Sequence, residues 1–329
     1  MVPSWRASLD AFAPDGWACG LTRDARAGTV TEVLEADVNQ YLELVREVLS
    51  KGTRKPNRTG VDTISTFNYN YEIDLREGFP LLTTKEISWK NIVVENLWFL
   101  SGEPHIGLLR KHGCKFWDPW ADENGLVPSA YGNFWRRYPV HDGQNVAFND
   151  QIQFVVDELK RNPNSRRLVV LAWAPGNAQT SKLPPCHAMF VFNVQYDKTG
   201  EPMLCLHLTQ RSADVALGVP YNIAGYALIL ELMARFTNLR SGIFAHTVID
   251  AHIYTGKPDG SMAEYDHIPG LMQQLERKPR KLPAMRMDPS LRSLSDIAPL
   301  LQADTVAVLK HFVLEGYEAH PAISFKVAV

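Results

Sequence analysis

The sequence predicts an α+β fold, a single domain with a mixed, mainly antiparallel sheet packed by helices. Helical and strand patterns are interspersed without strict alternation, which argues against a doubly wound parallel sheet. The 329 residues are 45% hydrophobic and 21% charged, so the chain can bury a sizeable core. No repeat and no Gly/Ser-rich or Pro-rich linker divides it. We therefore expect one domain over residues 36–329, preceded by an arm or tail over residues 1–35.

Apolar periodicity predicts the helices. Residues 38–51 carry apolar side chains at helical spacing and end before Gly52. Residues 89–101 are apolar nearly all round, which predicts a buried helix ending at Gly102. A third helix is expected over residues 151–162, with Asn149-Asp150 as its cap, and a long one over residues 221–236 after a turn at 218–220.

Runs rich in β-branched and aromatic residues predict the strands. They cover residues 167–173, 188–196, 203–208 and 243–254. The segments at 140–148 and 256–267 give no interpretable pattern.

Charge and cysteine content exclude several classes of protein. A net charge of −2 argues against general affinity for nucleic acid or membranes, so any phosphate must be bound by a few local arginines. The cysteines form no C-x-x-C pair, which favours reduced thiols and no metal site. No apolar run approaches the roughly 20 residues of a membrane span, and the N-terminus lacks a signal-peptide pattern. We expect a cytoplasmic protein.

The segment Leu183-Pro184-Pro185-Cys186-His187 holds a cysteine at the start of a strand. Two prolines stiffen the chain there and would fix the position of the thiol. Such a thiol is a nucleophile if nearby cations lower its pKa. A buried strand cysteine without chemistry is the alternative.

A second polar segment, Gln210-Arg211-Ser212-Ala213-Asp214, ends a strand. Arginine and serine together suit a phosphate. Asn222 follows at the start of the long helix, and its carboxamide offers a donor and an acceptor side by side, which matches the O4 and N3–H edge of uracil. An ordinary helix cap with a surface ion pair explains the same residues.

Other candidates are weaker. Arg166 and Arg167 precede an apolar strand and are most simply solvated charges, unless a phosphate lies near. Glu95 lies in the apolar helix, where burial would raise its pKa and let it relay a proton. It could instead reach solvent or pair with an arginine. His252 and Tyr254 point the same way along a strand, so both could reach one sugar hydroxyl.

Aromatic side chains gather at residues 116–120 and 131–135. Core packing is the default explanation for Trp117, Trp120 and Tyr131, but flat ligands also stack on such rings.

Taken together, these segments resemble the thymidylate synthase family. The matches recur in the family's order from about residue 36 to the C-terminus: Arg58-Thr59-Gly60, Phe79-Pro80-Leu81-Leu82-Thr83-Thr84-Lys85, Glu95 with Leu97-Trp98-Phe99, Trp117-Asp118 with Trp120, Tyr131-Gly132 with Trp135-Arg136, Ser165-Arg166-Arg167, Pro185-Cys186-His187, Gln210-Arg211-Ser212 with Asp214, Leu217-Gly218 with Pro220, Asn222-Ile223-Ala224, and His252 with Tyr254. The resemblance does not cover the first 35 residues.

The resemblance implies that Cys186 adds to C6 of a pyrimidine nucleoside monophosphate, most simply dUMP. The activated C5 then attacks the one-carbon unit of 5,10-methylenetetrahydrofolate, a reduced folate that serves as co-substrate. Arg211 would bind the phosphate and lower the thiol pKa, and Arg58 and Ser212 would share the phosphate. Arg166 and Arg167 would come from a partner subunit, which implies a homodimer.

The remaining roles are also carried over from the family. Glu95 and His187 would belong to the water network that moves protons to and from O4, and Tyr131 would assist removal of the C5 proton. Asn222 would read the base, and Gln210 would be a further substrate-binding residue. His252 and Tyr254 would hold the 3′-hydroxyl of deoxyribose. The folate side would be lined by Trp117, Trp120, Leu183, Asp214 and Val327.

The sequence departs from the family pattern near the folate and the C5 carbon, for example at Phe134, Ala174, Ala216 and Gly225. These departures leave open a pyrimidine nucleotide hydroxymethylase, in which water replaces the hydride and the substrate is dUMP, CMP or dCMP. Asn222 favours uracil, because cytosine-specific relatives tend to carry Asp there.

Two rival classes use the same residues. A thiol hydrolase would pair Cys186 with His187, but adjacent strand residues point to opposite faces, so His187 is badly placed as its base. A non-catalytic nucleotide-binding protein has no use for Glu95, Tyr131 and Cys186 together.

Overall fold

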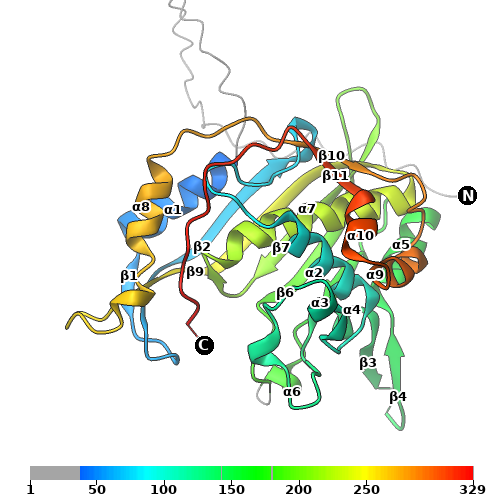
Figure 1. The fold of residues 1–329 in the computed structure, drawn as a ribbon. Coiled ribbons are helices and arrows are strands. Elements are labelled where there is room, and N and C mark those ends of the chain that lie inside the picture. The colour runs from blue at the N-terminus through cyan, green and yellow to red at the C-terminus, as the bar shows by residue number, and fades with distance from the viewer. Residues whose placement is uncertain (1–37, 142, 179–180, 329) are drawn as a thin grey trace, which may run out of the picture. The chain divides into compact units, whose positions relative to one another are not determined.

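The computed structural model describes residues 38–141, 143–178 and 181–328. The arm expected over residues 1–35 lies outside the described residues. The described part has an α+β fold, as the sequence predicts, with helices packed on a mixed sheet (Figure 1).

The main sheet has seven strands in the order β1-β2-β9-β7-β6-β5, with the short β8 also beside β9. Most neighbours are antiparallel, while β7 and β8 run parallel to β9. The strands are β1 (Thr53–Lys55), β2 (Asp62–Asp74), β5 (Val169–Leu171), β6 (His187–Tyr196), β7 (Pro202–Gln210), β8 (Ala213–Asp214) and β9 (Arg240–Thr255).

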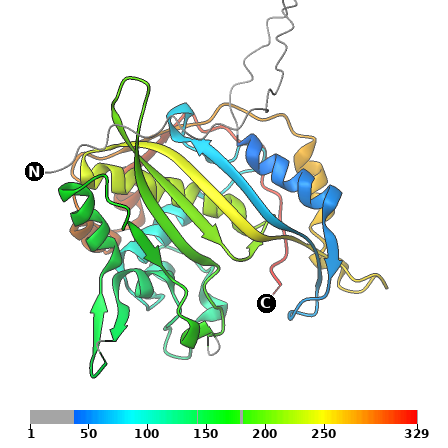
Figure 2. The same ribbon diagram turned by 180° about the vertical axis from the view of Figure 1, so that it is seen from behind.

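Two buried helices cover one face of this sheet. α7 (Gly218–Thr237) packs on β7 and β9, and α2 (Trp89–Ser101) packs on α7. Both are apolar on nearly every side because they have protein around them, as the composition of residues 89–101 predicts. Gly102, in a left-handed conformation, ends α2. Seen from behind, the long strands have no described helix over their middle (Figure 2).

Shorter elements complete the described part of the chain. They are α1 (Asn39–Lys51), α3 (Gly107–Lys111), α4 (Tyr131–Arg136), α5 (Gln151–Arg161), α6 (Pro175–Ala178), α8 (Ile268–Leu275), α9 (Ile297–Leu301), α10 (Thr305–Lys310), the hairpin β3 (Tyr138–His141) and β4 (Val146–Asn149), and the pair β10 (Ala284–Met287) and β11 (Phe312–Glu315). Among the described residues, no helix is both long and apolar enough to span a membrane.

The structure differs from the sequence-based expectation at three elements. The segment at 218–220 is the first turn of α7 rather than a turn before it. The strand expected over residues 167–173 is shorter in the structure, where β5 covers Val169–Leu171. The long strand β2 was not predicted, because polar Thr63 and Ser65 are buried while Phe67 is 83% exposed. A left-handed Asn68 interrupts the regular alternation beside Phe67.

Candidate active site

The loop before β6 is held by one arginine. Arg211 donates from Nε to the carbonyl of Pro185 (2.9 Å) and from Nη2 to the carbonyl of Pro184 (2.8 Å). Its backbone N–H donates to the carbonyl of Cys186 (2.9 Å). These bonds place Cys186 Sγ 3.6 Å from Arg211 Nη2, so the cysteine and the arginine that the sequence singled out lie in contact.

Two opposing effects act on the thiol of Cys186. Burial raises its pKa above the ordinary value, while the positive charges of Arg211 and Arg58 act to lower it. The expected influence of Arg211 is therefore present, but burial outweighs it in the protein alone. A thiol held between burial and fixed cations becomes more nucleophilic whenever the balance moves toward the cations.

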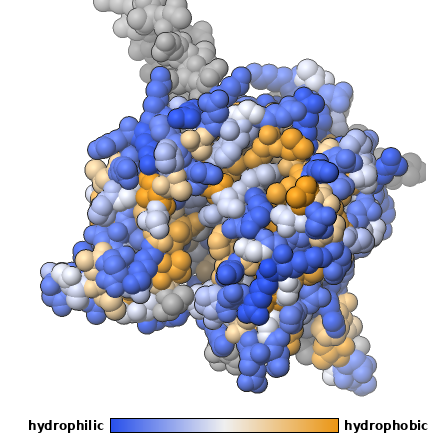
Figure 3. Space-filling view, viewed as in Figure 1, coloured by the Kyte–Doolittle hydropathy of each residue, from blue (hydrophilic) through white to orange (hydrophobic). Residues whose placement is uncertain are grey.

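Cys186 lies in a pocket of about 540 Å³. Among the expected site residues, the pocket is lined by Arg58, Trp120, Leu183, Cys186, Arg211, Ser212, Asp214, His252 and Tyr254. The rings of His252 and Tyr254 pack edge to face, with their centroids 5.3 Å apart. Both side chains lie on the same side of β9, as strand alternation predicts. The face of the molecule that carries the C-terminal segment is hollowed, with hydrophobic residues along the hollow (Figure 3).

A second group of expected residues lies deeper, around α2 and α4. Trp117 Nε1 donates to Glu95 Oε1 at 2.7 Å, and burial raises the pKa of Glu95 to about 7. Glu95 is partly exposed, and among the described residues no arginine forms an ion pair with it. It can gain or lose a proton near neutral pH.

His187 stacks face to face on Tyr131, with ring centroids 4.4 Å apart. The hydroxyl of Tyr131 accepts a hydrogen bond from the backbone N–H of Cys186 (3.1 Å). Burial lowers the pKa of His187 to about 3 and raises that of Tyr131, so both rings stay uncharged. With so low a pKa, His187 is too weak a base to take the proton of Cys186, which argues against the thiol hydrolase.

Asn222 lies in the second turn of α7 rather than at its start. Its Oδ1 accepts from Gln210 Nε2 at 3.1 Å. Asp214 holds the turn that precedes α7, since its Oδ1 accepts from the backbone N–H groups of Ala216 (2.9 Å) and Leu217 (3.0 Å).

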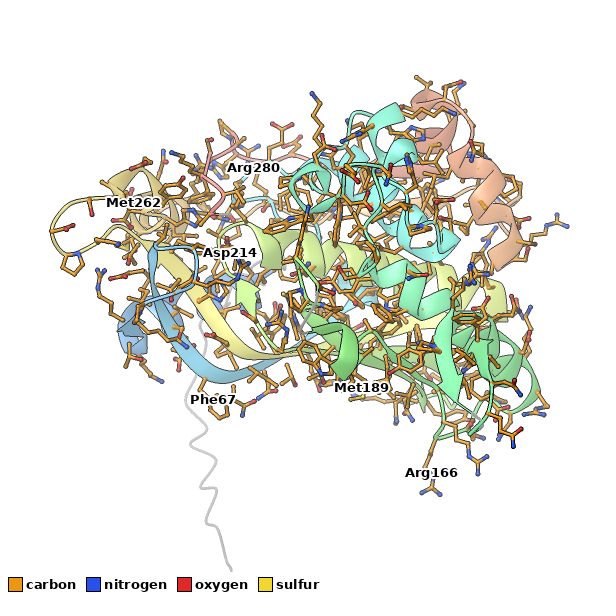
Figure 4. All side chains as sticks on the ribbon, turned by 90° about the horizontal axis from the view of Figure 1, so that it is seen from below. Phe67, Arg166, Met189, Asp214, Met262 and Arg280 are labelled. Atoms are coloured by element: carbon orange, nitrogen blue, oxygen red, sulfur yellow. The ribbon has the colours of Figure 1, made fainter. Side chains whose placement is uncertain are left out.

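Some expected residues lie elsewhere. Arg166 and Arg167 are exposed and do not line the pocket of their own chain, and Arg166 points outward, well away from Asp214 (Figure 4). Val327 is 57% exposed, and its neighbour Ala328 lines the pocket instead.

The structure adds pocket residues that the sequence did not single out: Lys55, Asn57, Trp173 and Asp250. Trp173 lies under the guanidinium of Arg211, 5.3 Å from ring centroid to Cζ. A lone aromatic at a strand end carries no signal of this contact. The departure at Gly225 is explained by Asn96, whose Nδ2 would lie 2.8 Å from a Cβ at that position.

No cluster of three or more His, Cys, Asp or Glu side chains suited to a metal occurs among the residues placed by the structure. The pocket thus combines a thiol, nearby cations, polar side chains and aromatic rings, while Gln210 and Asn222 are not among its lining residues.

Comparison with known proteins agrees with this arrangement. The family model described as thymidylate synthase matches residues 39–329. A protein named thymidylate synthase from Haloferax volcanii is 42% identical over 345 aligned positions, covering 87% of this chain and 95% of that protein. This chain belongs to the thymidylate synthase family.

Proposed function

We propose that the chain methylates C5 of dUMP to give dTMP, with 5,10-methylenetetrahydrofolate as co-substrate. The observation that carries this proposal is the contact between Cys186 Sγ and Arg211 inside a pocket that also exposes Arg58, His252 and Tyr254. Family membership supports the same reaction.

Phosphate binding and thiol activation are coupled through Arg211. Arg58, Arg211 and Ser212 provide the forked and hydroxyl donors that a phosphate needs. Cys186 adds to C6, which makes C5 nucleophilic. Trp173 and the two proline carbonyls keep the guanidinium in place while it faces both the phosphate and the sulfur.

Base and sugar are recognised by residues from different elements. Asn222 on α7 reads O4 and N3–H of the uracil with the support of Gln210, and His252 and Tyr254 on β9 bind the 3′-hydroxyl. Glu95, with its pKa near 7, exchanges a proton with O4 through water, and Tyr131 assists loss of the C5 proton.

The folate fits the aromatic side of the pocket. Trp120, Leu183, Asp214 and Ala328 line this side. Trp117 would complete it, and Val327 would close over the ligand. Reduced folate supplies the one-carbon unit and the hydride. The buried Trp117 ring and its bond to Glu95 keep water from the C5 side, which disfavours a hydroxymethyl product.

The active unit is a homodimer that shares its arginines. Arg166 and Arg167 are exposed and would complete the phosphate site of a partner subunit. The sheet face away from the helices also exposes the large apolar side chain of Phe67 (83%), which a second copy would bury (Figure 4).

We also propose that residues 36–329 form the catalytic domain, that residues 1–35 are an appended arm, and that the enzyme acts in the cytoplasm without nucleic-acid or membrane partners. The net charge of −2 and the free thiols of Cys114, Cys186 and Cys205 support this placement.

Covalent trapping tests the central step. The enzyme is mixed with 5-fluoro-dUMP and methylenetetrahydrofolate and examined by denaturing mass spectrometry with peptide mapping. A ternary adduct on Cys186 is expected. The absence of an adduct, or its location on Cys114 or Cys205, would contradict the proposal.

Product analysis separates methyl from hydroxymethyl transfer. Rising near-ultraviolet absorbance from dihydrofolate is expected in step with dTMP. Turnover to a hydroxymethyl nucleotide without dihydrofolate would replace the synthase by the hydroxymethylase.

Subunit mixing tests the shared arginines. Cys186→Ser and Arg166→Ala/Arg167→Ala homodimers should each be nearly inactive. Their equilibrated mixture should regain up to about a quarter of wild-type activity, because about half of its dimers are mixed and each mixed dimer has one intact site of two. No recovery after verified subunit exchange would show that the arginines act within their own chain.

A further inference from the structure

A row of buried polar side chains crosses the sheet beneath α7. Tyr71 on β2 and His246 on β9 are directly paired across the two strands, and Gln210 ends the adjacent strand β7. Their exposed fractions are 8%, 1% and 3%. Burying a polar side chain in the core costs free energy unless its donors and acceptors are hydrogen-bonded.

The row is continuous and ends at Asn222. The Tyr71 hydroxyl lies 2.6 Å from His246 Nδ1, and His246 Nε2 lies 3.0 Å from Gln210 Oε1. Gln210 Nε2 donates to Asn222 Oδ1 (3.1 Å) and to the backbone carbonyl of Ser212 (3.2 Å). Four side chains therefore form one path from the edge of the core to the base-reading asparagine.

A single backbone group fixes the polarity of this path. The carbonyl of Ser212 can only accept, so the Gln210 atom beside it must be the NH₂ group. Gln210 Oε1 then faces His246 and needs a donor, which requires His246 to carry its proton on Nε2. His246 Nδ1 is left as an acceptor, and the Tyr71 hydroxyl donates to it.

Burial keeps the two titratable members of the path, Tyr71 and His246, uncharged. It lowers the pKa of His246 well below its ordinary value and raises that of Tyr71 well above. His246 therefore stays a neutral imidazole with one donor and one acceptor throughout the neutral pH range. The same tautomer is thus available at every working pH.

We propose that Tyr71 and His246 are positioning residues that fix the amide of Asn222 in the orientation that accepts uracil and rejects cytosine. The inference rests on the proposed function, in which Asn222 reads the base. With Oδ1 turned toward Gln210, the second lone pair of Oδ1 can accept from N3–H, and Nδ2 can donate to O4.

Cytosine presents the opposite pattern, an acceptor at N3 and a donor at the 4-amino group. Binding it would require Asn222 to turn its NH₂ group toward the NH₂ group of Gln210. Gln210 cannot turn in response, because it would then face the Ser212 carbonyl with an oxygen and the His246 N–H with a donor. Two donors facing each other without water are costly, so the path acts as a discriminator.

The test compares the dissociation constants of dUMP and dCMP, measured calorimetrically on full-length wild type and variants. For His246→Leu, the ratio of the dCMP constant to the dUMP constant should fall by about tenfold or more, because Gln210 becomes free to turn. His246→Gln can keep one donor and one acceptor in place and should stay within about threefold of wild type. Tyr71→Phe should lie between them.

The matched control is His112→Leu. His112 is 3% exposed and bonds through Nε2 with the carbonyl of Leu301 and through Nδ1 with Thr305 Oγ1. It shares none of its hydrogen-bond partners with the path. Its loss should lower stability and leave the nucleotide ratio unchanged.

A second measurement uses the wild type and does not depend on variants that fold. ¹⁵N NMR of histidine-labelled enzyme should show His246 as the neutral Nε2–H tautomer from about pH 6 to pH 8. An Nδ1–H tautomer, or an unchanged ratio in folded His246→Leu, would overturn the inference. Failure of the wild type to form dTMP from dUMP would instead reject the proposed function.

Discussion

Cys186 has two different surroundings. On its pocket side, which we call the cationic wall, Arg58 and Arg211 present fixed charge to the solvent-filled pocket. On its inner side, the buried wall of Glu95, Trp117, Tyr131 and His187 holds groups whose pKa values are shifted toward their neutral forms. The cationic wall suits an anionic ligand, and the buried wall suits proton exchange without charge.

The titratable side chains of the buried wall also differ from one another in their pKa values. His187 and Tyr131 remain neutral over the whole physiological range, whereas the pKa of Glu95 is about 7. Among these four side chains, Glu95 is therefore the group able to give and take a proton during turnover. The other three exclude water and keep it in place.

The largest effect is expected where the two walls meet. Cys186→Ser replaces the thiol by a hydroxyl that is not ionised at neutral pH, so kcat should fall at least about a thousandfold. Dihydrofolate formation measures the loss. The cationic wall is left intact, so the dissociation constant of dUMP should change by no more than a few fold. More than about a tenth of wild-type activity would show that the thiol is not the nucleophile.

Arg211→Lys tests what the cationic wall contributes beyond charge. Lysine keeps the positive charge but cannot donate to the carbonyls of both Pro184 and Pro185 while facing the thiol. We expect kcat/KM for dUMP to fall about a hundredfold. Arg58→Lys serves as the control, because no hydrogen bond from it to the cysteine loop is seen among the described residues, and it should cost about tenfold or less. Equal losses would mean that charge alone matters.

Glu95→Gln tests the buried wall. It should lower kcat by about a hundredfold and remove a limb near pH 7 from the pH profile of kcat. The folded pKa of about 7 lies above the unfolded value, so the folded protein binds the proton more tightly. The stability this provides is complete below about pH 4 and is lost as pH rises to about 7.

Urea unfolding at two pH values measures that linkage. Between pH 5 and pH 8 the wild type should lose about 1–3 kcal/mol relative to Glu95→Gln, which has no such proton to release. A kcat profile that keeps its limb in the variant would assign the limb to another group.

The sequence predicted residues of both walls but not the hydrogen-bonded path through Tyr71 and His246. Cys186 and Arg211 stand in short motifs with strong turn and strand signals, and α2 was predicted with its observed bounds because its apolar residues and Gly102 leave little choice. The path through Tyr71 and His246 could not be foreseen. It depends on the pairing of β2 with β9, and β2 hides its periodicity by burying Thr63 and Ser65 and exposing Phe67.

The smallest expected effect concerns the segment that borders the folate side. Lys326 pairs with Glu264 Oε1 at 3.2 Å, lies 4.3 Å from the ring centroid of Tyr265, and accepts at its backbone carbonyl from His267 Nε2 at 2.9 Å. These contacts come from the segment at 256–267, which had no interpretable sequence pattern. They hold the chain just before Ala328, which lines the pocket.

The ion pair of Lys326 and Glu264 is about half exposed on both sides, so its loss should change affinity only slightly. Glu264→Gln should raise KM for methylenetetrahydrofolate about two- to threefold, with kcat and KM for dUMP nearly unchanged, and the effect should vanish at high salt. The charge-swapped double variant Glu264→Lys/Lys326→Glu should recover part of the loss. If the swap recovers nothing while Glu264→Gln is impaired, Glu264 acts on the folate rather than on the C-terminal segment. The dependence of KM on salt then distinguishes a held segment from a direct ligand contact, because a bond to the folate inside the pocket is screened less than an exposed pair.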